Sequence, residues 1–303
     1  MDLNVLLSGS LGVLGALLGT TVGVVVGYWL EGKRVERRAR FEKTRERERL
    51  RREHYEGALR YYKTGGRLRG FDLADRDLAD VNLANADLRG SELARANLFD
   101  AVLSRADLKV ANLLGAKLEY ADLQWAVLSG ANLEGACLSV AKLEGADLRG
   151  ANLKAAMLWG ANLERADLAV ANLEQATLAG TDLRAATLIG AKLQGANLRG
   201  ATLKGARLMA ANLQGAELEY ANLEGAKLWG ANLKEANLRG ANLKETSLEG
   251  ADLRGAKLDV STVMPDGWQA VVATRPEKVP APKVSAKSRK RAPRRSDTLR
   301  KRL

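Results

Sequence analysis

Residues 131–160 repeat one five-residue pattern six times without a break: ANLEG-ACLSV-AKLEG-ADLRG-ANLKA-AMLWG. Each unit has alanine first and leucine third, and the second residue is commonly Asn or Asp. In both directions from this stretch, leucine recurs at every fifth residue from Leu68 to Leu258, which makes 39 leucines with no skipped step. A fixed internal period of this kind indicates a repeat architecture, in which each unit buries its apolar residues against its neighbours.

A period of five residues excludes the two common secondary structures as the basis of the repeat. On a helix of 3.6 residues per turn, residues five apart point in successively different directions and form no continuous apolar face. In a strand, an odd period of five does not match the two-residue alternation of side chains. Departures from alanine at the first position cluster at the start of the array, with two more later: Gly66, Phe71, Arg76, Val81, Ser91, Thr181 and Thr246.

The motif A-(N/D)-L-x-x resembles that of the pentapeptide-repeat proteins, as in residues 151–155 (ANLKA) and 231–235 (ANLKE). The resemblance covers residues 66–260, nearly two-thirds of the chain. It implies an all-β solenoid, a right-handed quadrilateral β-helix with one pentapeptide per side, in which leucine and alanine point inward. Twenty residues per coil predict about ten coils, and a spacing of ~4.8 Å predicts a rod roughly 45–50 Å long.

Charge divides the chain into a neutral body and two basic flanks. The 303 residues carry a net charge of +12, with 46% hydrophobic and 5% aromatic residues. Residues 66–260 sum to about −2, whereas residues 31–65 and 261–303 sum to about +6 and +9. This placement fits a membrane surface better than a body that binds nucleic acid. The one cysteine, Cys137, excludes an internal disulfide.

Residues 1–30 are predicted to form a transmembrane helix. Residues 3–30 hold no charged side chain, and about 20 apolar residues suffice to cross a bilayer. Tyr28 and Trp29 stand where an interfacial aromatic belt is expected, and the Lys- and Arg-rich residues that follow place residues 31–303 on the cytoplasmic side. Four glycines recur at every fourth position and form a candidate helix-packing face, which suggests a homo-oligomer, although glycine is also simply common in membrane helices: Gly15, Gly19, Gly23 and Gly27.

Three further segments flank the array. Residues 31–65 alternate basic and acidic side chains, which predicts a charged helical spacer about 50 Å long; it either binds anionic lipid or is a plain solvated spacer. Residues 261–274 are predicted to cap the rod at its C-terminal end. Residues 275–303, rich in Pro, Lys and Arg, are predicted to be disordered, and either bind anionic lipid or nucleic acid or only aid solubility. Because of the anchor, we favour lipid and do not expect nucleic acid.

The sequence offers no catalytic constellation. The single histidine, His54, lies in the spacer, and Cys137 has no histidine near it in the repeat register. No phosphate-binding glycine loop and no metal-ligand spacing is present, so we predict neither an enzyme nor a cofactor or metal site.

The outer surface is the remaining candidate for function. If residues 20 apart stack, Ile189, Met209 and Trp229 form one apolar column. A second face carries an apolar set next to three pentapeptides (136–140, 156–160 and 176–180) without charge: Phe99, Tyr120, Val140, Met157 and Trp159. Such columns suggest a surface for a foreign protein or for self-association, although scattered apolar residues are normal on any surface.

We therefore predict a membrane-anchored scaffold that mediates protein–protein interaction without catalysis. The resemblance also suggests an alternative, because some pentapeptide-repeat proteins imitate DNA and bind gyrase. The near-neutral array departs from that pattern, since its acidic patch is confined to the first coil: Asp72, Asp75, Asp77 and Asp80. A third possibility is binding of lipid or nucleic acid through the basic tail.

Overall fold

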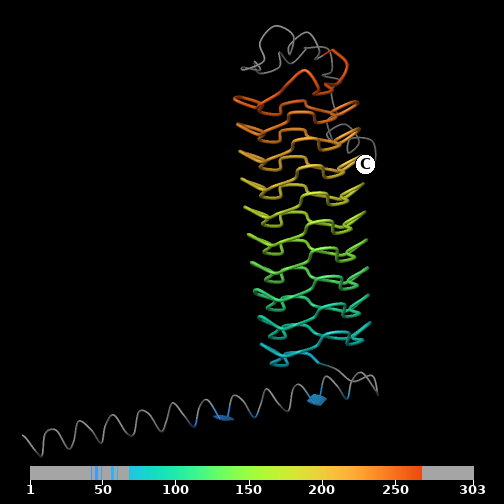
Figure 1. Ribbon diagram of the computed structural model, residues 1–303, viewed down its shortest axis with the longest axis vertical. Coiled ribbons are helices and arrows are strands. Elements are labelled where there is room, and N and C mark those ends of the chain that lie inside the picture. Colours follow the sequence, from blue (N-terminus) through green and yellow to red (C-terminus); the bar gives the residue numbers. More distant parts are fainter. Residues whose placement is uncertain are drawn as a thin grey trace, which may run out of the picture. The chain divides into compact units, whose positions relative to one another are not determined.

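The computed structural model describes residues 68–267 continuously, together with residues 42, 45, 46, 49, 56, 57 and 60. The chain divides into two compact units, Met1–His54 and Tyr55–Leu303, and the second contains the repeats. There the chain winds into a stack of coils that forms a rod (Figure 1). Parallel bridges join residues 20 apart, from Asp72↔Glu92 to Asn237↔Lys257, so each coil contains twenty residues.

Each coil has four sides, and each side is one pentapeptide. A side contributes a single-residue bridge at its second position, and no longer strand occurs within residues 68–267. We number the faces by their first pentapeptides. Face 1 starts with 68–70, the described part of its first pentapeptide, face 2 with 71–75, face 3 with 76–80 and face 4 with 81–85, and each recurs every 20 residues. Faces 1 and 3 lie on opposite sides of the rod, as do faces 2 and 4.

The repeat satisfies its backbone N–H groups in a fixed way, which explains the preference for Asn or Asp at the second position. In residues 151–155 the first N–H donates back to the carbonyl of Leu148 (3.0 Å), and the second donates to Ala131 in the preceding coil (2.9 Å). The third and fifth donate to Asn172 and Glu174 in the following coil (2.6 and 2.9 Å). The fourth points along its own side and donates to Oδ1 of Asn152 (3.2 Å). We call this last bond the Asx bond.

The fifth residue of every unit turns the corner. From Gly70 to Gly255 these residues have φ between +53° and +73°, and nineteen of them are not glycine. Positive φ at this position, with the hydrogen bond from the next N–H to the leucine carbonyl, is the geometry of a type II turn. β-Branched residues avoid this conformation, yet Val110, Val140 and Val170 adopt it. The stacking of the coils therefore overrides local preference at these corners.

The core is a column of leucine and alanine. The leucines at the third position, from Leu68 to Leu258, are all at most 6% exposed, and alanine at the first position is buried as well. This confirms the inward placement that the resemblance implied. Where threonine replaces alanine, its hydroxyl donates to a leucine carbonyl of the preceding coil: Thr181 to Leu158 (3.0 Å) and Thr246 to Leu223 (2.9 Å). The small first position thus accepts a hydroxyl without leaving it unpaired.

At the C-terminal end the array continues past residue 260, where the leucine period ends, with one residue inserted. Val263 bridges Asn242, 21 residues back instead of 20. Thr262 therefore takes the first position and donates to the carbonyl of Leu238 (3.0 Å), and Met264 takes the leucine position with 4% exposure. Pro265 follows, and it has no N–H with which to extend the ladder.

Before the array, the second unit includes three described helical residues, Glu56, Gly57 and Arg60. A Cβ built on Gly57 would lie 2.7 Å from Cε2 of Phe71, so the aromatic ring packs directly against this glycine. Glu42, Arg45, Glu46 and Arg49 of the first unit are also helical.

Several expectations fall outside the described residues. They are the transmembrane helix over 1–30 with its four spaced glycines, most of the spacer over 31–65, the end of the cap after residue 267 and the basic tail over 275–303. Among the described residues, no helix has the length and apolarity needed to cross a bilayer.

Candidate interaction surfaces

The four faces differ in how regularly they keep the Asx bond. On face 2 it recurs almost throughout, and asparagines of successive coils also bond to one another, as Asn152 Nδ2 does to Asn132 Oδ1 (3.1 Å). Face 3 has neither Asn nor Asp at the second position in four consecutive coils: Lys117, Cys137, Met157 and Thr177. Face 1 lacks them in another four: Thr187, Arg207, Lys227 and Ser247.

The loss of the Asx bond is a cost to the fold. A net hydrogen bond contributes about 0.5–1.5 kcal/mol, and stacking alone gives no reason to lose it in four consecutive coils of one face. These two stretches coincide with the two apolar columns that the sequence predicts. Positions that break a structural rule without a structural gain are where function is expected.

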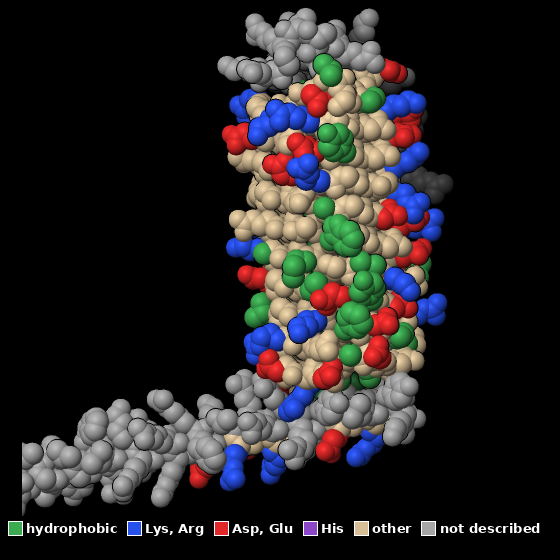
Figure 2. Space-filling model, viewed as in Figure 1, with side chains coloured by type: hydrophobic (Ala, Val, Ile, Leu, Met, Phe, Trp, Pro, Cys, Tyr) green, Lys and Arg blue, Asp and Glu red, His purple; other side chains and the backbone are tan. Residues whose placement is uncertain are grey.

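Face 3 carries an exposed apolar strip. Phe99 and Tyr120 come from successive coils, and their ring centroids lie 5.4 Å apart at 60°. Met157 and Trp159 are 46% and 59% exposed, and Val140 is half-buried. Figure 2 shows apolar side chains gathered over the lower and middle part of the visible face, with charged side chains around them. The structure thus brings the predicted members of this face together.

Cys137 lies within this strip. Its thiol is half-buried, 3.6 Å from the hydroxyl of Ser139 in the same pentapeptide. Desolvation raises the pKa of the Cys137 thiol above its ordinary value. A raised pKa lowers the thiolate fraction, so the environment does not activate this thiol as a nucleophile.

Face 1 carries the second column. The backbone joins its members, because Gly190 N–H donates to the carbonyl of Met209 (2.9 Å) and Ala210 N–H to that of Trp229 (2.9 Å). Trp229 is 53% exposed, whereas Ile189 and Met209 are half-buried. The sequence correctly predicts that these residues stack, but only Trp229 projects far from the surface.

Two cations accompany this column, which the sequence analysis did not single out. Arg207 and Lys227 bridge one another in successive coils, at the second position of the units that hold Met209 and Trp229. Both side chains are exposed, and neither makes an ion pair among the described residues. The absence of Asn and Asp from the second position in four consecutive coils of face 1 is the sequence signal that marks them.

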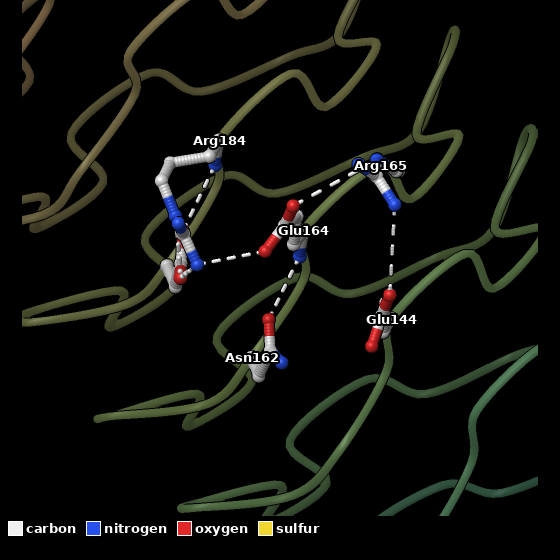
Figure 3. A network of polar contacts seen from close by, with 6 residues as sticks. Glu144, Asn162, Glu164, Arg165 and Arg184 are labelled. Carbon is white, nitrogen blue, oxygen red and sulfur yellow. Dashed lines mark hydrogen bonds and ion pairs between the residues drawn. The ribbon is translucent and has the colours of Figure 1, made fainter.

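Face 4 carries a chain of ion pairs two coils above the exposed Trp125. Arg184 contacts Glu164 (2.7 Å), and Arg165 lies between Glu164 (3.7 Å) and Glu144 (3.9 Å), as Figure 3 shows. Asn162 accepts the N–H of Glu164 in the same network (3.0 Å). Exposed pairs of this kind contribute little to stability, so this face is a solvated surface.

Two of the acidic residues of the first coil bond to the next coil. Asp75 pairs with Arg95 (2.6 Å), and Asp77 accepts a bond from Asn97 (2.7 Å). No group of three His, Cys, Asp or Glu side chains within the described part of the chain is placed to hold a metal ion.

A family model described as pentapeptide repeats matches eight copies across residues 77–259, in six overlapping segments. The chain belongs to the pentapeptide-repeat family. Membership implies the right-handed β-helix that the sequence motif suggested. No curated protein sequence matches the chain.

Solved structures of other pentapeptide-repeat proteins are similar to this chain. HetL, involved in heterocyst differentiation regulation in the cyanobacterium Nostoc sp. strain PCC 7120, is 39% identical over 69% of this chain and 96% of its own, with a TM-score of 0.46. QnrB1, a plasmid-mediated fluoroquinolone resistance protein, is 19% identical over 66% and 92%, with a TM-score of 0.39. A thylakoid-lumen protein of Arabidopsis thaliana is 30% identical over 40% and 85%, with a TM-score of 0.29.

Proposed function

We propose that this pentapeptide-repeat protein is a non-catalytic scaffold that binds a partner protein through face 1. The main support for this proposal is the column of Met209 and Trp229 with Arg207 and Lys227 beside it. These residues lie in the coils where face 1 has no Asx bond. Trp and Arg are the side chains that most often dominate binding energy at interfaces. Unpaired cations next to an exposed indole favour a partner surface that combines apolar and acidic side chains.

The experiment is a crosslinking pull-down of the full chain from membranes. The first variant is the triple substitution Ile189→Asp, Met209→Asp and Trp229→Asp, and the second is the charge reversal Arg207→Glu and Lys227→Glu. The matched control is Trp159→Asp, which removes an equally exposed indole from the opposite face.

We expect one set of captured proteins to be lost with both face 1 variants and kept with the control. The conservative pair Arg207→Lys and Lys227→Arg is expected to keep it too, because the charge remains. Captures that are identical in the wild type and both face 1 variants would remove face 1 from the proposal.

We further propose that residues 3–30 anchor the scaffold in a membrane, with residues 31–303 on the cytoplasmic side. The support is the uncharged stretch followed at once by basic residues. The full chain is expected to stay in the membrane fraction after alkaline extraction, and a chain without residues 1–30 is expected to leave it. Protease added to sealed membranes from the cytoplasmic side should digest the flanks of the rod. A wild-type chain in the soluble fraction would contradict the anchor.

A further inference from the structure

The pattern of side chains on face 3 repeats itself when the rod is turned end over end. Met157 and Trp159 lie near the middle of the array that runs from Leu68 to Met264. The unit one coil before this central unit holds Cys137 and Ser139, and the unit one coil after it holds Thr177 and Ala179. Turning the rod end over end places Cys137 where Thr177 was and Ser139 where Ala179 was. All of these side chains are uncharged.

The correspondence extends to shape. At the corner position, Val140 corresponds to Gly180 one coil from the centre, and Tyr120 corresponds to Gly200 two coils from it. Tyr120 is 50% exposed, and nothing lies within 4 Å of a Cβ built on Gly180 or Gly200. The side chains of Val140 and Tyr120 therefore match open space on the other half, whereas Tyr220 (67% exposed), three coils from the centre, corresponds to Asp100.

The correspondence also extends to charge. Two coils from the centre, Glu119 corresponds to Arg199, so an acidic residue on one half matches a basic residue on the other. Arg199 already pairs with Glu219 (2.6 Å), while Glu119 makes no ion pair among the described residues. Through the further coils of the face, none of the corresponding pairs joins two like charges.

From this self-complementarity we propose that face 3 binds a second copy of this chain in an antiparallel pair. The two-fold axis is perpendicular to the rods and passes between the two Trp159 side chains. In a pair of this symmetry each residue meets its counterpart on the other half of the partner's face. Trp159 packs against Trp159 of the second copy, Tyr120 packs over Gly200 of the second copy, and Glu119 pairs with Arg199 of the second copy.

A parallel pair with its two-fold axis along the rods fits less well. It would set the second position of each unit against the fourth and fifth positions of the same coil in the partner. Asp77 would then face Asp80 of the second copy, and Glu217 would face Glu219 of the second copy. Like charges held opposite one another are destabilising, so the antiparallel arrangement is favoured.

The area of face 3 determines how tightly the two copies are expected to bind. A side of about three extended residues is roughly 10 Å wide, and the rod is roughly 45–50 Å long, so the flat area is on the order of 500 Å² per copy. Specific interfaces bury about 800 Å² per partner. We therefore expect a dimer that dissociates on dilution. It leaves face 1 of both copies exposed on the outside, so it does not depend on the proposed binding through face 1.

Cys137 provides the test, because it is the only cysteine of the chain and lies on face 3. The rate at which a bulky maleimide labels it is measured on the full chain in detergent across a dilution series. The ratio of the rates at low and high concentration reports on the burial of face 3, whatever the membrane segment does. For the wild type we expect labelling to be at least about 5-fold slower at high concentration, and the ratio to fall to about one in Trp159→Asp.

The proposed pair of Glu119 with Arg199 of the second copy distinguishes the antiparallel dimer from other arrangements of two copies. Glu119→Arg is expected to abolish the concentration dependence, because it sets two arginines against each other. The double variant Glu119→Arg with Arg199→Glu is expected to restore it, and the face 1 control Trp229→Asp is expected to keep it. Circular dichroism checks that each variant is folded. A wild-type ratio of one at all concentrations, or a double variant that is not rescued, would overturn the proposal.

Discussion

The indole ring of Trp125 lies directly over Gly145, the residue at the same corner in the next coil. A Cβ built on Gly145 would collide with the ring at Cε3 and Cζ3. Tyr220 has the same relationship to Gly240, where the added Cβ would lie 2.5 Å from Cδ1. At these two corners the aromatic ring occupies the space that a Cβ at the next corner would need, so positions 20 residues apart are linked.

Gly145→Ala tests this link directly. We expect a loss of about 2–4 kcal/mol in the free energy of unfolding, because the left-handed corner costs alanine about 1 kcal/mol and the clash with Trp125 adds overpacking. Gly135→Ala is the matched control, since its φ of +63° is similar and its added Cβ meets nothing within 4 Å. The control should lose only about 1 kcal/mol. The double variant Trp125→Ala with Gly145→Ala should recover most of the difference in urea unfolding; equal losses at the two glycines would refute the link.

The asparagine ladder on face 2 predicts a graded response to substitution. Asn152 donates to Asn132 and Glu134, and its Oδ1 accepts from Lys154 N–H and from Asn172. Asn152→Ala is expected to cost about 1.5–3 kcal/mol, because several bonds of about 0.5–1.5 kcal/mol each are lost together.

Asn197→Ala is the control for the ladder, because within residues 68–267 the Asn197 side chain makes one hydrogen bond, which it accepts from Arg199 N–H (3.1 Å). It is expected to cost about 1 kcal/mol. Thermal unfolding by circular dichroism measures both variants. If Asn197→Ala were as damaging as Asn152→Ala, the bonds between coils would contribute nothing beyond the Asx bond.

Asp259 predicts a stability change at acid pH. The Ser261 hydroxyl, together with Gly240 N–H, lowers the pKa of Asp259 to about 2. The unfolded pKa is about 3.9, so this stabilisation is fully present above about pH 4 and is lost as the pH falls through about 2. Asp259→Asn should therefore melt earlier than the wild type at pH 7, and the gap should close between pH 4 and pH 2. A gap that stays constant over this range would contradict the assignment.

Face 4 predicts a small and salt-dependent effect. Arg184→Ala removes the contacts with Glu164 and Asp182, but all three side chains reach solvent. We expect the melting temperature to fall by on the order of 1–2 °C at low salt and not at all in about 1 M salt, where screening acts within about 3 Å. Differential scanning calorimetry at two salt concentrations measures this. A larger loss that persists in salt would show that the network is structural.

The fold could be predicted from the sequence, whereas the surfaces could be predicted only in part. The five-residue period from Leu68 to Leu258 predicted the solenoid, and the stacking of Ile189, Met209 and Trp229 followed from it. The half-burial of Ile189 and Met209 did not follow, because it depends on side chains of adjacent coils. The position of Arg207 and Lys227 beside this column was missed as well, since the Asx bond that they replace is visible only in the hydrogen bonds.

The C-terminal end shows the same division. The leucine period ends at Leu258, so the sequence alone ended the array near residue 260. The chain then inserts one residue, and Thr262 and Met264 return to the positions of alanine and leucine.

The sequence by itself determined the coil, its length and its core, because one large and one small apolar residue per side leave a single way to fill so narrow a rod. Only the tertiary structure decided at which positions the surface departs from the regular repeat. The pairing of Trp125 with Gly145, the lost Asx bonds of faces 1 and 3 and the inserted residue before Thr262 all depend on contacts between neighbouring coils. The repeat determines which residues of neighbouring coils lie next to one another, but the side chains found 20 residues away determine which contacts form.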